Sequence, residues 1–89
     1  MNLKIIYSDD ALRQLKKLSP TLSKRIVLKI ADNAIQVDPL SRAKALQGTL
    51  SGKYRYRIGD YRAIFTIDEK GNITILTILN IKHRKDVYK

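Results

Sequence analysis

The sequence concentrates arginine on two adjoining segments that alternate between polar and apolar residues. Gly59-Asp60 separates these segments, and two residues of this type between alternating stretches predict a β-hairpin with a tight turn. In that hairpin Arg57 pairs with Arg62, and alternation along each strand places Arg55 on the same face of the sheet. Guanidinium groups donate hydrogen bonds in a planar fork that matches a pair of anionic oxygens. The pattern therefore predicts a phosphate-binding face.

A basic face could also serve solubility alone, but the arrangement of the arginines argues against that reading. Like charges that lie directly opposite each other on two strands destabilise the pair by about 0.2–1 kcal/mol. A solvated structural face would place Glu or Thr opposite one of them. The other face of the hairpin carries the residues that we expect to pack against helices, namely Tyr54, Tyr56, Tyr61, Ala63 and Phe65.

The C-terminal segment adds cations and an aromatic ring to the same candidate site. Lys82, His83 and Arg84 leave the end of a predicted strand beside the hairpin, and we expect them to reach the arginine face. Tyr88 supplies a ring on which an unpaired base can stack, as is common in the recognition of single-stranded RNA. Each residue alone would be read as a surface or packing residue. Together with the arginines they indicate a site for RNA.

The sequence lacks the residues that several other kinds of active site need. One His and no Cys exclude zinc-type spacing, and no Gly-rich phosphate loop of the Walker kind is present. The few acidic residues fall mostly in predicted turns and helix starts, which argues against a two-metal nuclease. We therefore expect no metal and no cofactor. Cleavage of RNA would then use its own 2′-hydroxyl to attack the adjacent phosphate, with cations stabilising the charged transition state.

Composition agrees with a nucleic-acid partner. Eighteen Lys and Arg against eight Asp and Glu give a formal net charge of +10 on 89 residues. Such an excess destabilises a small domain by self-repulsion unless a polyanion or an acidic protein offsets it. The length fits a single domain, residues 1–89. No signal peptide and no run of about 20 apolar residues is apparent, so we expect a cytoplasmic protein that is not in a membrane.

The spacing of apolar residues along the sequence predicts the helices and strands that must position the site. Ser8 and Ser19-Pro20 are N-terminal signals for two helices that carry apolar residues at helical spacing. We expect helices over about 9–18 and 20–35, a connecting loop over 39–52, and strands over 3–7, 54–58, 61–67 and 73–81. The order is β-α-α-β-β-β. This predicts a two-layer α+β domain in which a helical hairpin packs on one face of a mainly antiparallel sheet.

Two motifs carry a resemblance to a known family. Gly59-Asp60-Tyr61-Arg62-Ala63-Ile64-Phe65, preceded by Tyr54-Arg55-Tyr56-Arg57, and His83-Arg84-Lys85-Asp86-Val87-Tyr88 resemble the RelE branch of the RelE/ParE toxin superfamily. The likeness spans nearly the whole chain. It implies a RelE-like fold and a toxin of a type II toxin–antitoxin system, which enters the ribosomal A site and cleaves mRNA. It also implies an acidic antitoxin that wraps the toxin in a hetero-oligomeric complex.

The resemblance also assigns roles to individual residues. Arg62 matches an arginine that stabilises the cleaved phosphate, Arg84 matches a second one, and Tyr88 matches a tyrosine that stacks on the substrate base. Lys82 could share or replace the role of Arg84, because the spacing before Val87-Tyr88 varies in the family.

Arg55 and Arg57 stand at strand positions where RelE proteins often carry Lys, and this difference leaves the mechanism open. Arginine stays protonated and is a poor general base. A proton acceptor would have to be Lys53, His83 or Tyr88, or the mechanism could rest on electrostatics alone. Two other functions stay open as well: a ParE-type inhibitor of DNA gyrase, which shares the fold but cuts nothing, and a catalytically inactive RNA- or ribosome-binding module.

Overall fold

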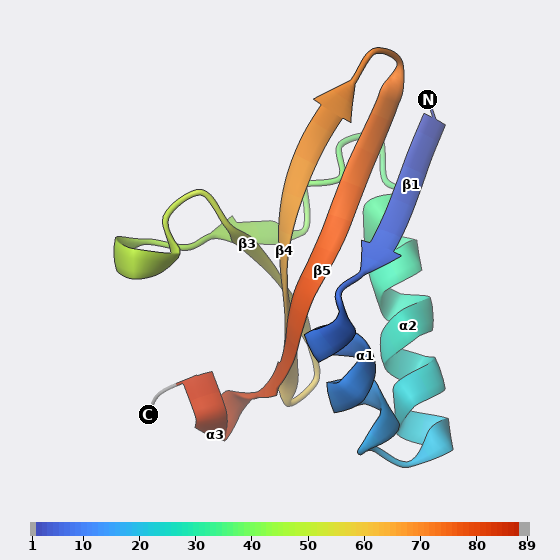
Figure 1. Ribbon diagram of the computed structural model, residues 1–89, viewed down its shortest axis with the longest axis vertical. Helices are drawn as coiled ribbons and strands as arrows, with labels where there is room; N and C mark the ends of the chain where they lie inside the picture. Colours follow the sequence, from blue (N-terminus) through green and yellow to red (C-terminus); the bar gives the residue numbers. More distant parts are fainter. Residues whose placement is uncertain (1, 88–89) are drawn as a thin grey trace.

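The protein folds as two helices on one face of a five-stranded sheet (Figure 1). The structure is a computed structural model that describes the backbone of residues 2–87 and the side chains of residues 2–85. The strands are β1 (Asn2–Tyr7), β2 (Ala43–Ala45), β3 (Tyr54–Ile58), β4 (Tyr61–Lys70) and β5 (Ile73–His83). The helices are α1 (Asp9–Lys16), α2 (Pro20–Ala34) and the short α3 (Arg84–Val87). The expected α+β architecture is confirmed.

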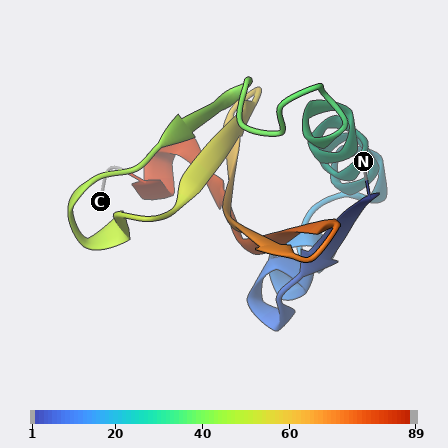
Figure 2. The same ribbon diagram turned by 90° about the horizontal axis from the view of Figure 1, so that it is seen from above.

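The strand order is β1-β5-β4-β3-β2, and only the β1–β5 pair is parallel. The sheet is mixed and mainly antiparallel, as expected. It curves strongly when seen from above, and α2 lies inside the curve (Figure 2). No helix within residues 2–87 is long and apolar enough to cross a membrane.

Both main helices begin at the serines that the sequence indicates. The Ser8 hydroxyl accepts a hydrogen bond from the Ala11 N–H at 3.0 Å, and the Ser19 hydroxyl accepts one from the Leu22 N–H at 3.2 Å. Pro20 occupies the first position of α2, where its missing N–H is not needed. The helices end one or two residues earlier than the apolar spacing predicts.

The core lies between α2 and the hairpin of β3 and β4. Tyr56 and Phe65 are fully buried and their rings stack with centroids 4.3 Å apart, against Ile26 and Ile30 of α2. The Tyr56 hydroxyl donates a hydrogen bond to the Pro39 carbonyl at 2.6 Å. These contacts confirm the expected apolar face of the hairpin.

Residues 39–52 are not simply a loop, and here the sequence-based expectation is wrong. They contain β2, which pairs antiparallel with β3, and a 3-10 turn, η1 (Gly48–Leu50). The strand is only three residues long, and only Ala43 packs against the core. A single inward-facing residue gives no alternating pattern, so β2 could not be recognised in the sequence.

The end of β5 also differs from expectation. The strand continues two residues further than predicted, through His83, and Arg84–Val87 form the short helix α3. The pairing with β4 is interrupted by a bulge, since Ile64 pairs with Asn80 but Phe65 pairs with Ile78. Helix α1 secures this bulge: Ser8 donates to the Ile78 and Leu79 carbonyls at 2.9 and 2.7 Å. Residues beyond the bulge are therefore held by α1 as well as by β4.

Candidate nucleic-acid interface

The hairpin register that places the arginines is the one that the sequence predicts. Arg57 pairs with Arg62, and Arg55 pairs with Ile64. Gly59 has φ of 59°, and within the described residues no residue other than glycine has positive φ. The turn therefore has glycine in the left-handed conformation at its first central position only, as in a type II′ turn, which matches the twist of the two strands.

Three cations lie side by side across the sheet, on the face that points away from α1 and α2. Arg62 of β4 pairs with Arg57 of β3 on one side and with Lys82 of β5 on the other. We name Arg57, Arg62 and Lys82 the basic row. Neighbouring strands are about 4.8 Å apart, so the three side chains leave the sheet within reach of one phosphodiester group or two adjacent ones. Arg55, paired with Lys44 of β2, extends the positive surface on the same face.

Burial distinguishes the members of the basic row. Arg62, in the middle, is only 9% exposed, Lys82 is half-buried and Arg57 is exposed. Positive side chains that are placed side by side repel one another, and that repulsion costs free energy. An anion bound across the row would lower that cost, which is the physical reason for reading it as a phosphate site.

Three carboxylates lie away from the basic row, namely those of Asp10, Asp32 and Asp68. Asp10 pairs with Arg13, and Asp32 lies 3.3 Å from Arg42. Asp68 shares the sheet face of Arg62 but lies about 20 Å further along β4. The side chains of Arg55, Arg57, Arg62 and Lys82 share this face and make it basic. No three His, Cys, Asp or Glu side chains within residues 2–85 lie close enough together to hold a metal ion.

Arg84 lies beside the hairpin turn. Its backbone N–H donates to the Asp60 carbonyl at 2.7 Å, and its Nε is 3.8 Å from an Asp60 carboxylate oxygen. These contacts connect the start of α3 to the β3–β4 turn, at the same end of the sheet as the basic row. Tyr88, the expected stacking residue, lies outside the described residues.

His83 and Lys53 do not share the position of the basic row. Because β5 continues through residue 83, His83 falls on the opposite face from Lys82 and packs edge-on against Tyr61, with ring centroids 5.1 Å apart. Lys53 immediately precedes β3 and lies four residues from Arg57, about 13 Å along the strand. The structure thus brings Arg55, Arg57, Arg62 and Lys82 together and places the other two elsewhere.

Two residues of this region were missed by sequence reasoning. Lys44 joins the positive face through β2, the strand that was expected as loop. Gln14 of α1 accepts a hydrogen bond from the Ile81 N–H at 2.6 Å and donates to the Asn80 side chain at 3.3 Å. It thereby fixes the strand end that carries Lys82. A polar residue in the inward-facing stripe of a helix was the signal that could have identified Gln14.

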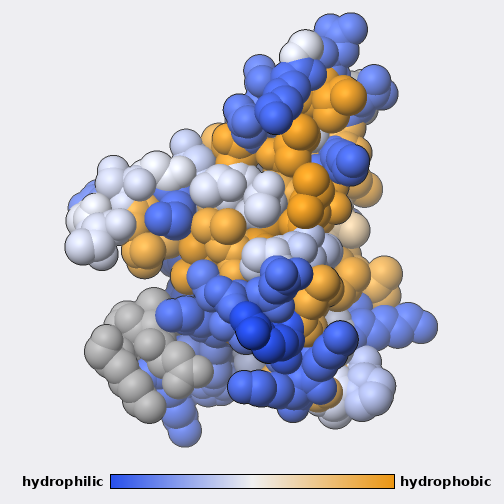
Figure 3. Space-filling model, viewed as in Figure 1, coloured by the Kyte–Doolittle hydropathy of each residue, from blue (hydrophilic) through white to orange (hydrophobic). Residues whose placement is uncertain are grey.

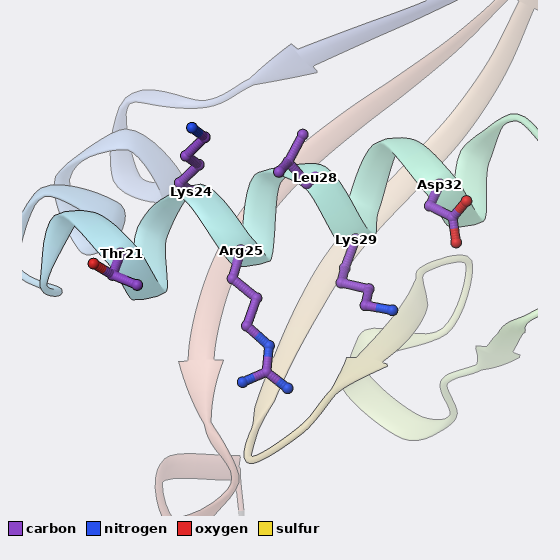
Figure 4. Close-up of a pocket in the computed structure, with 6 residues that line it drawn as sticks. All are labelled: Thr21, Lys24, Arg25, Leu28, Lys29 and Asp32. Atoms are coloured by element: carbon purple, nitrogen blue, oxygen red, sulfur yellow. The ribbon is translucent and has the colours of Figure 1, made fainter.

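A shallow hollow on α2 lies apart from this face (Figure 4). Its lining comes from one side of a single helix, and it includes Lys24, Leu28 and Asp32. The elements around it bring no further functional side chain into it. We therefore do not regard it as the reactive site.

The sequence matches a known protein family. Residues 5–88 match the family model described as the ParE toxin of the type II toxin–antitoxin system parDE. The chain is 32% identical over 83 residues to Toxin RelG of Mycobacterium tuberculosis, covering 93% of this chain and 92% of that protein.

Solved structures show the same fold. In the toxin–antitoxin complex RelBE2 of Mycobacterium tuberculosis, a chain with 28% identity superposes with a TM-score of 0.74, covering 94% of this chain and all of that one. In the archaeal RelE–RelB complex of Pyrococcus horikoshii, the identity is 25% and the TM-score 0.71, over 94% of this chain and 97% of that one.

Proposed function

We propose that this chain, which belongs to the ParE toxin family of type II toxin–antitoxin systems, acts as an endoribonuclease that cuts mRNA in the ribosomal A site. The observation that carries the nuclease part of the proposal is the basic row. Its three cations lie side by side, with a largely buried arginine in the middle. That arrangement suits the negative charge that develops on a phosphate during transfer.

The proposed reaction is attack by the 2′-oxygen of the RNA on the adjacent phosphorus. The bond from phosphorus to the 5′-oxygen of the next nucleotide breaks, and the products are a 2′,3′-cyclic phosphate and a 5′-hydroxyl. The 2′-hydroxyl loses its proton and the departing 5′-oxygen gains one. Arg62 donates to the phosphate oxygens that gain charge in the transition state, and Arg57 and Lys82 add positive potential from either side.

The proton acceptor is not provided by an obvious neighbour of Arg62. His83 lies on the other face of the sheet and Lys53 lies about 13 Å from Arg57 along β3. Most of the rate enhancement therefore comes from stabilising the charge on the phosphate and from positioning the RNA. Arg84, beside the turn, is proposed as a second phosphate contact, and Tyr88 as the residue that stacks on the base.

We also propose an acidic antitoxin as the physiological partner. The two structures cited above are complexes of a toxin with its antitoxin. A net charge of +10 favours a partner of opposite sign, and an acidic, partly disordered chain could fold as it wraps the toxin. Co-expression with the acidic protein encoded beside this chain should give a stable cytoplasmic complex and restore growth. Failure of the two to purify together would argue against the pairing.

Inhibition of DNA gyrase is the second candidate, because the matching family model is that of ParE. One pair of assays separates the candidates: cleavage of mRNA on programmed ribosomes, and supercoiling of plasmid DNA by gyrase. We expect cleavage that requires ribosomes, and unchanged gyrase activity. Lys29→Gln, on α2 away from the basic row, serves as a matched charge-loss control and should cut normally. Uncut message together with stalled gyrase would establish the ParE-type function. Ribosome binding with neither effect would indicate an inactive binding module.

A further inference from the structure

A second concave surface adjoins the basic row at the end of β5, on the helix-facing side of the sheet. Its lining comprises Gln14, Lys17, Leu18, Tyr61, Ile81, Lys82 and His83. Of these residues, only Lys82 is also a member of the basic row. We name this surface the Tyr61 hollow.

The Tyr61 hollow offers aromatic surface. Tyr61 and His83 are both half-buried, and their rings meet edge to face at an interplanar angle of 86°. Each ring is held by the other and by pairing of the β4 and β5 backbones. Rings that are fixed in this way and still reach solvent are suited to stack on an unpaired base.

The Tyr61 hollow also has cations on two sides. Lys17 approaches from the end of α1, and Lys82, whose side chain leaves the opposite face with the basic row, borders the hollow at the end of β5. Lys17 is exposed and directly follows the last residue of α1. A phosphate that passes from the row to the hollow would therefore remain next to a positive side chain.

The sheet is incomplete beside the end of β5, where the Tyr61 hollow adjoins the basic row. β1 ends at Tyr7, which pairs with Ile78, so the last residues of β5 have no strand on that side. The Ile81 N–H donates a hydrogen bond to Gln14 of α1 on that side, while the strand end beyond Ile81 pairs with β4 on its other side (Figure 1). Hydrophilic side chains gather over this end of the molecule, below an apolar band (Figure 3).

We infer that the Tyr61 hollow is a second subsite for single-stranded RNA. The phosphate to be cut lies on the basic row, and a flanking nucleotide turns round the end of β5. Its base packs against the rings of Tyr61 and His83, and its phosphate lies between Lys82 and Lys17. This inference rests on the proposed RNA-binding function of the basic row and extends it to the other side of the strand.

The test measures binding of fully 2′-O-methylated RNA, which lacks the attacking hydroxyl and stays intact. Oligomers of about 4 and about 12 nucleotides span the usual site sizes of single-strand binding surfaces. Lys17→Gln should lower the salt slope by about 0.7 for the longer oligomer and leave the shorter one unchanged. Lys16→Gln, one residue earlier and outside the hollow, is the matched control and should change neither slope. His83→Gln should weaken binding of the longer oligomer roughly fivefold or more.

The outcomes separate this inference from the proposed function. If Lys17→Gln and Lys16→Gln behave alike with the longer oligomer while Arg57→Gln still lowers the slope, the basic row binds RNA and the Tyr61 hollow does not. If the unchanged protein binds neither oligomer, both the hollow and the RNA-binding role of the row are wrong. Circular dichroism of each variant verifies that the fold is intact.

Discussion

Arg57 and Arg62 occupy directly paired positions on β3 and β4, and their side chains leave the sheet on the same face. Lys82 pairs with Arg62 from the other side, so the central arginine has a cation on each flank. Such a row opposes folding through like-charge repulsion and favours the binding of a polyanion. Substitutions in it should therefore change stability and RNA binding in opposite directions.

Replacing Arg57 is the most direct test of the expected opposite changes in stability and in RNA binding. Arg57→Gln should make the free protein more stable by about 0.2–1 kcal/mol, because one member of a like-charged pair is lost. The same change should lower the salt slope of single-stranded RNA binding by about 0.7, for one phosphate contact. Urea unfolding and fluorescence anisotropy at several salt concentrations measure the two effects. An unchanged slope with an intact fold would remove Arg57 from the site.

Arg62 should control the chemical step. Arg62→Ala should reduce ribosome-dependent cleavage by about 10²–10³-fold, as expected when one preorganised donor to a developing oxyanion is lost. Ribosome binding should be largely retained. Because Arg62 is only 9% exposed, Arg62→Met, which keeps the aliphatic stem, is the companion variant that guards against a packing defect. Normal cleavage by the Met variant would show that the guanidinium has no part in the reaction.

The reaction should not require a metal ion held by the protein. Cleavage should persist in chelator at a free magnesium level that keeps the ribosomes whole. The upstream fragment should end in a 2′,3′-cyclic phosphate, because the 2′-oxygen is the attacking group. Mass spectrometry of the fragments identifies the ends. A 5′-phosphate on the downstream fragment would instead indicate attack by water, and would contradict the proposed mechanism.

Gln14 should contribute to stability through the end of β5. Gln14→Leu removes the acceptor of the Ile81 N–H and should cost about 1–3 kcal/mol in the free energy of unfolding. Hydrogen exchange of the Ile81 amide should become faster, because α1 no longer restrains the strand beyond the bulge. Lys16→Ala, on the exposed side of the same helix, is the control and should change stability little. Unaltered exchange at Ile81 would argue that β4 alone holds this segment.

Loss of the Tyr56 proton should make the stability of the protein fall at alkaline pH. Burial, reinforced by the charge of Asp38, raises the pKa of Tyr56 to about 12 from its ordinary value of 10.0. Between pH 10 and 12 the unfolded chain loses this proton first, so stability falls as pH rises, by up to about 1.4 kcal/mol per pH unit.

The matching variant is Tyr56→Phe. At neutral pH it should be less stable than the wild type by about 1–3 kcal/mol, because the buried Pro39 carbonyl loses its donor. The difference should shrink from pH 10 to 12, because only the wild type has this group to titrate. Parallel unfolding curves for the two proteins across that range would contradict the assignment.

Several features of the fold could be predicted because they depend on short-range interactions. The starts of α1 and α2 follow from Ser8 and Ser19, whose hydroxyls satisfy N–H groups only three residues away. The pairing of Arg57 with Arg62 follows from the glycine turn between them, because a two-residue turn leaves one possible register. Local geometry was sufficient at these positions.

The positions of Lys44 and His83 required the tertiary structure. Lys44 reaches the positive face through a three-residue strand that exists because β3 offers a free edge, and no pattern in residues 39–52 signals this. His83 was expected to reach the arginine face but lies against Tyr61, because β5 continues two residues further than its apolar run. A strand reverses the direction of each successive side chain, so an error of one or two residues at its end decides which face a residue joins.

The sequence by itself thus determined the residue types of the basic row, the hairpin that pairs two of them and the order of the helices and longer strands. Only the tertiary structure decided that Lys82 completes the row and that Gln14 of α1 fixes the strand carrying it. These relationships join residues up to 67 positions apart. They depend on how α1 meets the bulge in β5, which is settled by the packing of the whole domain, since no local pattern encodes such a contact.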